Sequence, residues 1–357
     1  MNAASLVRAP TVRLAELRDP MERDRIDDFL DTQPAATPFH SRAWLGAVEA
    51  ATGHGAHVLL CEERSQIVGL LPLHRASSLF GAALVSTGFA VGGGILAETP
   101  RIAALLAGAA EELAARLACP AIDLRGGTLP EARLGWHVRH DSHASFVAPL
   151  AADDETQMLG VPRKQRAEVR KGLANNLEIC VGSDATDRAM HYTVYAESVR
   201  NLGTPVFPRT LFAAVLDRFG DDADILTVLS DGTPVASVLS LYHRGAVMPY
   251  WGGGTAAARA LRANDAMYYA LMGHARARGC TRFDFGRSKT GSGAYHFKRN
   301  WGFEPQPLAY ATWTASGATP RDADPTSPRY QAMIAAWRHL PLLLANRIGP
   351  AIARGLA

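Results

Sequence analysis

An internal repeat is the feature that most constrains how this chain can fold. Residues 119–126 (CPAIDLRG) match residues 280–287 (CTRFDFGR), with a cysteine and an aspartate at the same places in both segments. Upstream of them, residues 91–95 (VGGGI) correspond to 251–255 (WGGGT), and residues 67–75 correspond to 235–244. Because similarity in the same order at several places marks a structural unit used twice, the chain is predicted to contain two similar halves.

Each half has the same expected order of elements: a hairpin, a glycine-rich bend, a helix and a strand. Polar turns at residues 62–66 and 230–234 separate apolar segments that alternate as β-strands do. Residues 101–117 and 264–278 carry apolar side chains at helical spacing, and Gly279 ends the second of these helices. An α/β (α+β) fold is therefore predicted, with tandem domains that each contain a mixed β-sheet flanked by helices.

The predicted domain boundaries follow from this repeat. The first domain covers residues 1–155, and the second covers residues 156–317 and begins with a basic helix over 163–171 that ends at Gly172. Further helices are expected over 187–198 and 209–219. Residues 318–328 read as a loop, and a final amphipathic helix is expected over 330–340.

Composition excludes several classes of protein. With 357 residues, 48% of them hydrophobic and 20% charged, the chain has the composition of an ordinary globular protein of two domains. The net charge of +3 gives no argument for DNA binding. The four cysteines lie far apart without ligand spacing, which predicts reduced, mostly buried thiols and no metal site.

Neither end of the chain carries a predicted membrane span. Residues 1–25 lack the apolar core of a signal peptide, and the apolar stretch 340–345 is far below the ~20 residues needed to cross a bilayer. A cytoplasmic protein is expected.

The repeat and the segment after it resemble a known family. The layout of the halves is similar to the GNAT acyltransferase fold in two tandem copies. Residues 283–288 (FDFGRS) and 293–305 (GAYHFKRNWGFEP) resemble the FemAB-like acyltransferases, in particular the FemAB-type proteins encoded with PEP-CTERM and exosortase systems. This resemblance implies transfer either of amino acids from aminoacyl-tRNA or of acyl groups from coenzyme A thioesters. The chain lacks the long coiled-coil insertion frequent in the tRNA-dependent members, so acyl-CoA is the expected co-substrate and tRNA the alternative.

Acyl transfer to an amine needs a nucleophile, a route for its proton and charge aimed at the developing oxyanion. The resemblance implies that Lys298 places a positive charge near the acyl donor, with Phe297 and Trp301 packing along its stem. The alternative is that Lys298 and Arg299 form an exposed basic pair at the start of a strand.

Three further residues are candidates for proton transfer or orientation. His243 ends the second hairpin, and His243 or His296 can accept the amine proton. Asp284 is expected at the end of a buried strand, where it can orient a lysine, an arginine or the substrate amine. His74 and Asp123 occupy the matching places in the first half, which favours a structural role for His243 and Asp284 as the alternative.

The segment 286–293 has the glycine, hydroxyl and cation content of a phosphate-binding loop. It predicts contacts to a coenzyme A pyrophosphate, or to an acceptor phosphate, from Arg287, Ser288, Lys289, Gly291 and Gly293. A flexible surface loop is the other interpretation.

Candidate substrate contacts lie in three more places. Tyr250 and Trp251 precede three glycines and can line an acceptor groove, or pack in the core. Thr204 and Phe207 belong to an apolar loop, 201–208, that is expected to border the cleft. The basic helix offers phosphate or headgroup contacts, or only a solvated face, through Lys164, Arg166 and Arg170.

The last segment combines apolar and basic residues. Met333, Ile334, Trp337, Leu340 and residues 342–344 alternate with Arg338, Arg347 and Arg354. This pattern suits docking on an anionic membrane surface, and a helix packed on the core has the same pattern.

The predicted function is metal-independent N-acylation of an envelope lipid or glycan precursor by acyl-CoA, with a long-chain sphingoid amine as one version of the acceptor. Two alternatives remain: aminoacyl-tRNA-dependent transfer, and an inactive binding module for envelope assembly.

Overall fold

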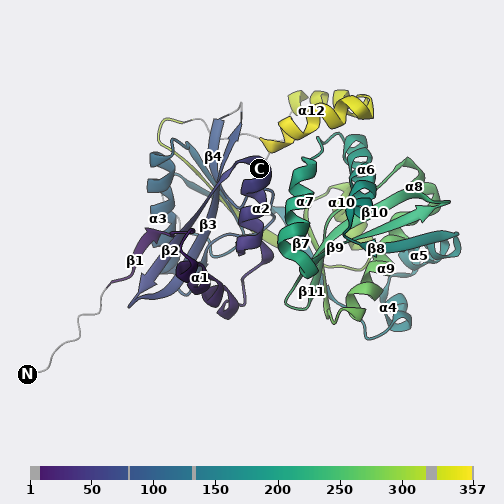
Figure 1. Ribbon diagram of the computed structural model, residues 1–357, viewed down its shortest axis with the longest axis horizontal. Coiled ribbons are helices and arrows are strands. Elements are labelled where there is room, and N and C mark those ends of the chain that lie inside the picture. The colour runs from purple at the N-terminus through teal and green to yellow at the C-terminus, as the bar shows by residue number, and fades with distance from the viewer. Residues whose placement is uncertain (1–8, 79–80, 131–133, 319–327, 356–357) are drawn as a thin grey trace, which may run out of the picture. The chain divides into compact units, whose positions relative to one another are not determined.

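The computed structural model describes residues 9–78, 81–130, 134–318 and 328–355 (Figure 1). The chain divides into two compact units. Unit 1 combines Met1–His140 with Ala309–Asp322 and Gly355–Ala357, and unit 2 combines Asp141–Leu308 with Ala323–Arg354. The boundary expected between residues 155 and 156 falls inside a helix of unit 2, α4 (Asp154–Gly160).

The sheet of unit 1 has the strand order β1-β2-β3-β4-β6-β13, with the short strand β5 also paired to β3. All neighbours are antiparallel except β4 and β6, which are parallel. The strands are β1 (Thr11–Leu14), β2 (Gly55–Glu63), β3 (Gln66–Ser78), β4 (Gly81–Ser86), β5 (Leu96–Ala97), β6 (Ala121–Arg125) and β13 (Pro305–Thr314).

Helices cover both faces of this sheet. They are α1 (Pro20–Thr32), the short 3-10 helix η1 (Pro38–His40), α2 (Arg42–Thr52) and α3 (Pro100–Arg116). Successive residues of a strand point to opposite faces, so Leu60 packs in the cluster under α1 and α2 while Leu59 packs under α3. The N-terminal helices α1 and α2 were not expected from the sequence, although the side chains of Asp19 and Ser41 cap their first turns.

The sheet of unit 2 repeats the same pattern in the order β8-β9-β10-β11-β12-β7, again with one parallel pair, β11 and β12. The strands are β7 (Trp136–Pro149), β8 (Leu177–Gly182), β9 (Ala223–Ser230), β10 (Thr233–His243), β11 (Ala246–Gly254) and β12 (Arg282–Lys289).

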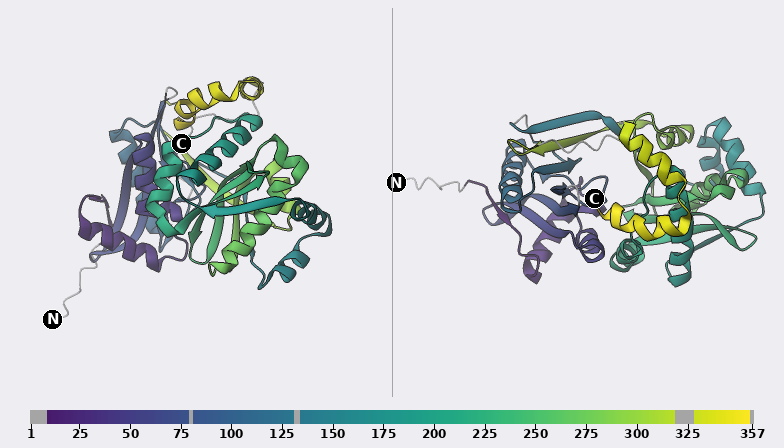
Figure 2. Two further views of the ribbon diagram at one scale, coloured as in Figure 1. Left: turned by 45° about the vertical axis from the view of Figure 1, so that its right-hand side comes forward. Right: turned by 90° about the horizontal axis from the view of Figure 1, so that it is seen from above.

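The helices of unit 2 are α4, α5 (Arg163–Ala174), α6 (Ala185–Leu202), α7 (Arg209–Phe219), η2 (Gly220–Asp222), α8 (Ala256–Leu261), α9 (Ala263–Ala277), α10 (Gly293–Asn300), α11 (Pro328–Arg338) and α12 (Leu342–Arg354). Residues of α5 and α9 share one apolar cluster with the sheet. Helices α11 and α12 pack next to α6 (Figure 2).

The structure confirms the predicted repeat, because the two units contain the same elements in the same order. Each unit has an antiparallel hairpin, β2–β3 or β9–β10, followed by a third strand, a helix and a parallel strand. Asp123 and Asp284 lie in the two parallel strands, β6 and β12, and Cys119 and Cys280 precede them. Both units are mixed sheets flanked by helices, as predicted.

Two strands exchange between the halves of the chain. β13 follows α10 of unit 2 but pairs with β6 in unit 1, from Tyr310 opposite Arg125 to Thr314 opposite Ala121. β7 begins in unit 1 and pairs with β12 in unit 2. The domain boundaries expected from sequence did not include this exchange, because the pairing of distant strands leaves no local signal.

Other expectations are corrected in detail. The second glycine-rich segment is part of β11 and not a bend. The final segment forms two helices, α11 and α12, instead of one, and most of the expected loop over 318–328 lies outside the described residues. All four cysteines are unbridged, and Cys61, Cys119 and Cys280 are buried, whereas Cys180 is only partly buried. Over the described ranges, no helix combines the length and hydropathy that crossing a bilayer requires.

Candidate functional site

The parallel strands β11 and β12 of unit 2 pair only at their beginnings. Ala246 lies opposite Arg282 and Val247 opposite Phe283, and the pairing ends there although both strands are described over their full lengths. Tyr250 is an extra residue in β11, since Leu239 of β10 faces Trp251 and the next residue of β10, Ser240, faces Pro249. A β-bulge beside diverging strands is a common setting for an active site, because it redirects backbone and side-chain groups.

A second bulge lies in β12. Asp284 faces Val147 of β7, whereas Arg287 faces Ser145, so β12 has one residue more than its partner. Gly286 adopts the left-handed conformation, with φ of 70°, and its N–H donates to Asp284 Oδ1 at 2.9 Å. Asp284 therefore lies within a strand that continues to Lys289, and not at the strand end expected from sequence.

Lys298 projects onto this bulge from α10. Its Nζ donates to the carbonyl oxygens of Gly286 at 3.2 Å and of Arg287 at 2.9 Å. Ser292 caps α10 by accepting from the N–H of Tyr295. The side chain of Lys298 is buried, with the residue 9% exposed, while Arg299 is exposed. The two residues are thus on a helix, and the alternative of an exposed basic pair at a strand start is wrong.

The surroundings of Lys298 shift its protonation. Its Nζ lies 5.5 Å from the ring centroid of Phe146 and 5.7 Å from that of Phe285. Burial lowers the pKa of Lys298 from 10.5 to about 8; Asp284 opposes this shift, and Arg287 adds to it. Burial also raises the pKa of Asp284, against the effects of the Gly286 N–H and of Lys298.

Aromatic rings enclose the site on the α9 side. Tyr268 of α9 contacts the rings of Phe285, Phe297 and Trp301. Two polar atoms in this region, Ser288 Oγ and Trp301 Nε1, are buried without a hydrogen-bond partner among the described residues. Buried polar groups are usually paired, so these two are available to a ligand or water. Sequence reasoning missed Phe146 and Tyr268, since nothing local links β7 or α9 to Lys298.

The segment predicted to be a phosphate-binding loop, residues 286–293, is mostly regular secondary structure. Arg287, Ser288 and Lys289 belong to β12, and Gly293 begins α10, so only residues 290–292 connect the two elements. Gly291 supplies the positive φ, 75°, that this tight connection requires. The predicted cations therefore lie on a strand, and the interpretation of 286–293 as one loop is corrected.

The two candidate histidines are not brought to Lys298. His243 ends β10 opposite Ala246, which pairs with Arg282 at the beginning of β12, whereas Lys298 contacts Gly286 and Arg287 farther along that strand. His296 is exposed on α10, with its ring beside that of Tyr295. Neither histidine joins the group around Lys298 and Asp284.

The candidate acceptor residues form a connected aromatic group. The Trp251 ring is buried against Phe212 of α7, at 4.8 Å between centroids, and lies 6.1 Å from Phe207. Tyr250 is partly buried and lies 5.0 Å from Trp251. Thr204 is exposed, and its N–H caps the C-terminus of α6 by donating to Val199. The structure therefore joins Tyr250, Trp251 and Phe207, with Trp251 in the core packing that was the alternative.

The basic helix α5 is confirmed, but its cations differ in their surroundings. Arg166 donates to the carbonyl oxygens of Leu159 and Val161 and so holds the end of α4. Lys164 and Arg170 are exposed. Arg170 and Tyr269 line a shallow depression of about 310 Å³ beside α4.

The equivalent place in unit 1 is filled by the chain itself. After β4, residues 87–95 run against the end of β6, and a Cβ on Gly94 would lie 1.8 Å from the carbonyl oxygen of Gly126. The guanidinium of Arg125 donates to the carbonyl of Ala90 at 3.0 Å. His74 is wholly buried: its Nε2 donates to the Leu45 carbonyl, its Nδ1 accepts from the Gly88 N–H, and burial lowers its pKa to about 4. In this half, the backbone around Gly94 and Ile95 therefore lies against Gly126 and Gly127, directly after the parallel strand β6.

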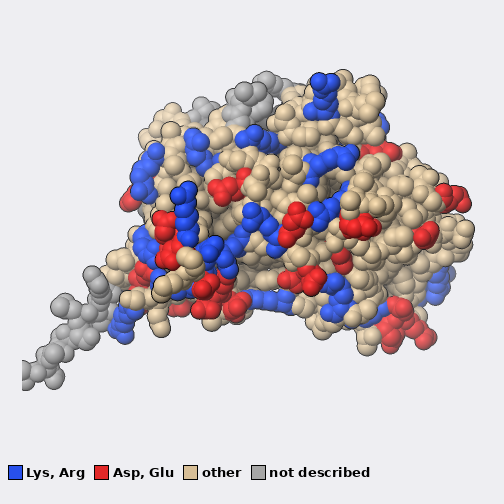
Figure 3. All heavy atoms as spheres, in the orientation of Figure 1, with Lys and Arg blue, Asp and Glu red and all other residues tan. Residues whose placement is uncertain are grey.

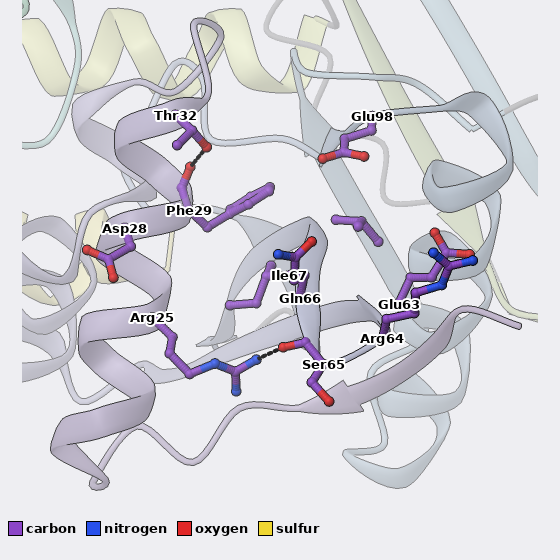
Figure 4. Close-up of a pocket in the computed structure, with 11 residues that line it drawn as sticks. Arg25, Asp28, Phe29, Thr32, Glu63, Arg64, Ser65, Gln66, Ile67 and Glu98 are labelled. Atoms are coloured by element: carbon purple, nitrogen blue, oxygen red, sulfur yellow. Dashed lines mark hydrogen bonds between the residues drawn. The ribbon is translucent and has the colours of Figure 1, made fainter. Parts of the chain in front are cut away.

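A surface depression larger than the one beside α4 lies in unit 1. It measures about 610 Å³ and lies between α1 and the β2–β3 turn (Figure 4). Arg25 and Ser65, which are hydrogen-bonded across it, belong to its lining together with Phe29. None of the residues proposed from sequence lines it, so its size alone does not make it the candidate site.

A family model matches part of the second half of the chain. Residues 162–299 match the family model described as "Acetyltransferase (GNAT) domain". This match begins just before α5 and ends in α10, so it includes β11, β12 and Lys298. No protein among the curated ones matches the chain in sequence.

Solved structures share the fold at low identity. FemX superposes with a TM-score of 0.63 at 14% identity, over 81% of this chain and 95% of that chain. A tandem GNAT protein from the clavulanic acid biosynthesis pathway gives 0.57 at 14% identity, over 87% and 100%. The C-terminal domain of a putative lysylphosphatidylglycerol synthetase from Agrobacterium fabrum gives 0.53 at 12% identity, over 91% and 96%. The chain has a tandem GNAT fold, and residues 162–299 of its second half match the model of a GNAT acetyltransferase domain.

Proposed function

We propose that unit 2 is an N-acyltransferase that moves an acyl group from a coenzyme A thioester to an amine of an envelope lipid or glycan precursor. A long-chain sphingoid amine, as in ceramide synthesis, is one specific acceptor that fits this proposal. The family match supports acyl transfer, and the nature of the donor and the acceptor is our inference from the site and from the FemAB resemblance.

The observation that carries the proposal is the buried ammonium of Lys298 at the bulge of β12. In the reaction the amine nitrogen forms a bond to the thioester carbonyl carbon, the carbon–sulfur bond breaks, and the amine proton replaces the acyl group on the leaving thiol. Negative charge develops on the carbonyl oxygen during this step. A cation that the Gly286 and Arg287 carbonyls hold in a largely apolar pocket stabilises that charge more than a solvated lysine would.

Asp284 has a positioning role in this proposal. Its carboxylate holds the N–H of Gly286, which fixes the bulge whose carbonyl oxygens face Lys298. Its charge also favours the protonated form of Lys298. Asp123 has no lysine counterpart, and the corresponding place of unit 1 is filled, so we assign unit 1 a structural role.

The donor side is proposed to use the polar residues of β12. The unpartnered hydroxyl of Ser288 lies one residue after Arg287 and one before Lys289. These residues suit an anionic, hydrogen-bonding co-substrate such as acyl-CoA, which would bind and leave in each turnover.

The acceptor side is proposed to use Tyr250 and Phe207, the partly buried members of the aromatic group, while Trp251 supports them from the core. This group combines broad apolar surface with the 201–208 loop, which suits an acceptor with a hydrocarbon part. We place the protein in the cytoplasm, at the inner membrane surface where such amines are found.

Transfer by the purified protein tests the proposal. Acyl-CoA donors of graded chain length are mixed with a soluble sphingoid amine, and thiol release and N-acyl product are measured together. The expected result is equal amounts of both, reduced at least tenfold in Lys298→Met and unchanged in Lys171→Met, which removes an exposed lysine of the same unit. Absence of product with every acyl-CoA and every amine, from folded protein, would overturn the proposal.

Aminoacyl transfer from charged tRNA is the second candidate. The fold similarity to FemX and to the lysylphosphatidylglycerol synthetase domain favours it. Against it, lysines and arginines are interspersed with acidic residues on the face seen in Figure 3, and tRNA binding needs a broad basic surface. Product formation that depends on aminoacyl-tRNA, and that ribonuclease abolishes, would select this candidate.

A further inference from the structure

The C-terminal helix α12 turns its smallest residues toward the protein and its largest apolar residues toward solvent. Ala345, Gly349 and Ala353 recur at every fourth position, which places them on one face, and all three are buried. A Cβ on Gly349 would lie 3.2 Å from the Val206 side chain, so the helix packs closely on the 201–208 loop. Burial of the long apolar side chains is the usual arrangement in a surface helix, and here it is reversed.

The outward face of α12 is apolar. Leu343 is 88% exposed, Leu344 45%, Ile348 37% and Ile352 41%. Leu344, Ile348 and Ile352 are again four residues apart and form one stripe. Met333 of the neighbouring helix α11 adds a further exposed apolar side chain, at 54%. The exposed apolar stripe of α12 is a feature that marks an interaction surface.

The two helices that carry these apolar residues contain charged residues of one sign only. Residues 328–354, which contain both helices, include no aspartate or glutamate. Arg347 and Arg354 are exposed, and the helical spacing places them along one edge of the stripe, beside Leu343. In Figure 3 the region of α12 is correspondingly tan and blue.

We infer that the outward face of α12 docks on the surface of an anionic lipid bilayer. An apolar stripe bordered by arginines lets the leucines and isoleucines enter the acyl region while the guanidinium groups stay with the lipid phosphates. A second copy of this chain fits less well, because a two-fold contact through α12 would bring the arginines of the two copies together, and neither α11 nor α12 contains an aspartate or glutamate to offset their charge.

The docking face is connected to the proposed acceptor group. Arg338 of α11 donates to the Leu202 carbonyl, and a Cβ on Gly203 would lie 2.5 Å from Ile334, so both terminal helices rest on the 201–208 loop. Phe207 of that loop contacts Trp251. Docking by α12 therefore brings the loop that borders the acceptor group close to the bilayer. This last step rests on the proposed function, whereas the docking itself does not.

Vesicle binding of the full chain tests the inference. Sucrose-loaded vesicles of phosphatidylcholine alone, or with phosphatidylglycerol, are sedimented with the wild type and with the double variant Leu344→Glu/Ile348→Glu. Ile179→Glu/Val181→Glu on β8 is the matched control, because these apolar residues are 39% and 43% exposed and lie outside α12. The expected result is binding to the anionic vesicles that falls at least tenfold in the α12 variant and stays unchanged in the β8 variant.

A second variant tests the charges without altering the apolar stripe. Arg347→Gln/Arg354→Gln is expected to bind anionic vesicles more weakly and with less dependence on salt. Wild-type protein that stays in the supernatant with anionic vesicles would overturn the inference. Equal binding by the wild type and by Leu344→Glu/Ile348→Glu would also overturn it. A concentration-dependent dimer that forms in the wild type and is lost in this double variant would do the same.

The assay also separates this inference from the proposed function. Acylation of a short, soluble amine is expected to be the same in the α12 variant and the wild type, while acylation of a vesicle-borne amine falls in the variant. Vesicle binding without any transferase activity would leave docking intact and count against the acyltransferase proposal.

Discussion

The Nζ of Lys298 donates a hydrogen bond of 2.9 Å to the carbonyl oxygen of Arg287, on the strand that precedes its own helix. A short turn over residues 290–292 allows this contact, because it folds α10 back onto β12. Lys298 also donates to the carbonyl oxygen of Gly286, which lies in the stretch where the β12 bulge interrupts pairing with β7. Arg287 and Lys298, which are 11 residues apart in the sequence, are thus brought into contact by the bulge of β12 and the short turn that follows it.

The charge state of Lys298 predicts the pH dependence of turnover. If the protonated form acts on the oxyanion, turnover is lost as pH rises through about 8, the pKa to which burial lowers this lysine. Lys298→Arg, which stays charged in this range, is expected to retain activity at high pH relative to its own value at pH 7. A wild-type profile that instead rises through pH 8, in parallel with that of Lys298→Arg, would contradict the assignment.

Substitutions of Asp284 and of Arg287 should shift the pH dependence of turnover in opposite directions. Asp284 raises the pKa of Lys298 and Arg287 lowers it. Asp284→Asn is therefore expected to shift the loss of turnover to lower pH, and Arg287→Gln to higher pH. Measurements of kcat from pH 6 to pH 10 provide the check, with Asp123→Asn as the matched control that leaves the midpoint and the rate unchanged.

The lowered pKa of Lys298 also predicts how the stability of the folded protein depends on pH. The folded-state pKa of Lys298 is below the ordinary value of 10.5, so between about pH 8 and pH 10.5 the unfolded chain binds more protons at this residue than the folded one. Wild-type stability must then rise with pH relative to Lys298→Met, by about 3 kcal/mol at most for a shift of this size. Urea unfolding of both proteins at pH 7.5 and pH 10 measures the difference, and a constant difference would show that the lysine is not perturbed.

The glycine of the β12 bulge should matter for both stability and activity. Gly286 and Gly232 both have positive φ, 70° and 72°, and a Cβ at either place meets no atom within 4 Å. Alanine at either position is expected to lower stability by about 1 kcal/mol. Only Gly286→Ala should also lower turnover several-fold, because it disturbs the carbonyl oxygens that hold Lys298. Equal effects of the two substitutions on turnover would exclude a special role for the bulge.

The two histidines provide a negative prediction. His243→Ala and His296→Ala should each leave kcat within about threefold of the wild type, because neither side chain joins the group at Lys298. A loss of two orders of magnitude in either variant, with Km unchanged, would assign that histidine to the chemistry and require the acceptor to bind on its side.

Much of the fold was predictable because its signals are local. Helices α3, α5, α7 and α9 lie within a few residues of their predicted ranges, since apolar periodicity and end signals are carried by adjacent residues. The hairpin turns are likewise local. The site was predictable only as a list of residues: Lys298, Asp284, Arg287 and Ser288 do lie together, whereas His243 and His296 were chosen for their chemistry and lie elsewhere.

The sequence by itself determined that the chain has two similar halves and that its distinctive residues follow the second repeat. Only the tertiary structure decided which groups lie together. The exchange of β7 and β13, the burial of Lys298 between Phe146 and Phe285, and the filling of the unit 1 site all depend on contacts between residues far apart in the chain. The same is true of α12, whose amphipathic pattern fits a helix folded on the core as well as one at a membrane. Its apolar stripe became a surface only because the small residues of the helix pack against the 201–208 loop.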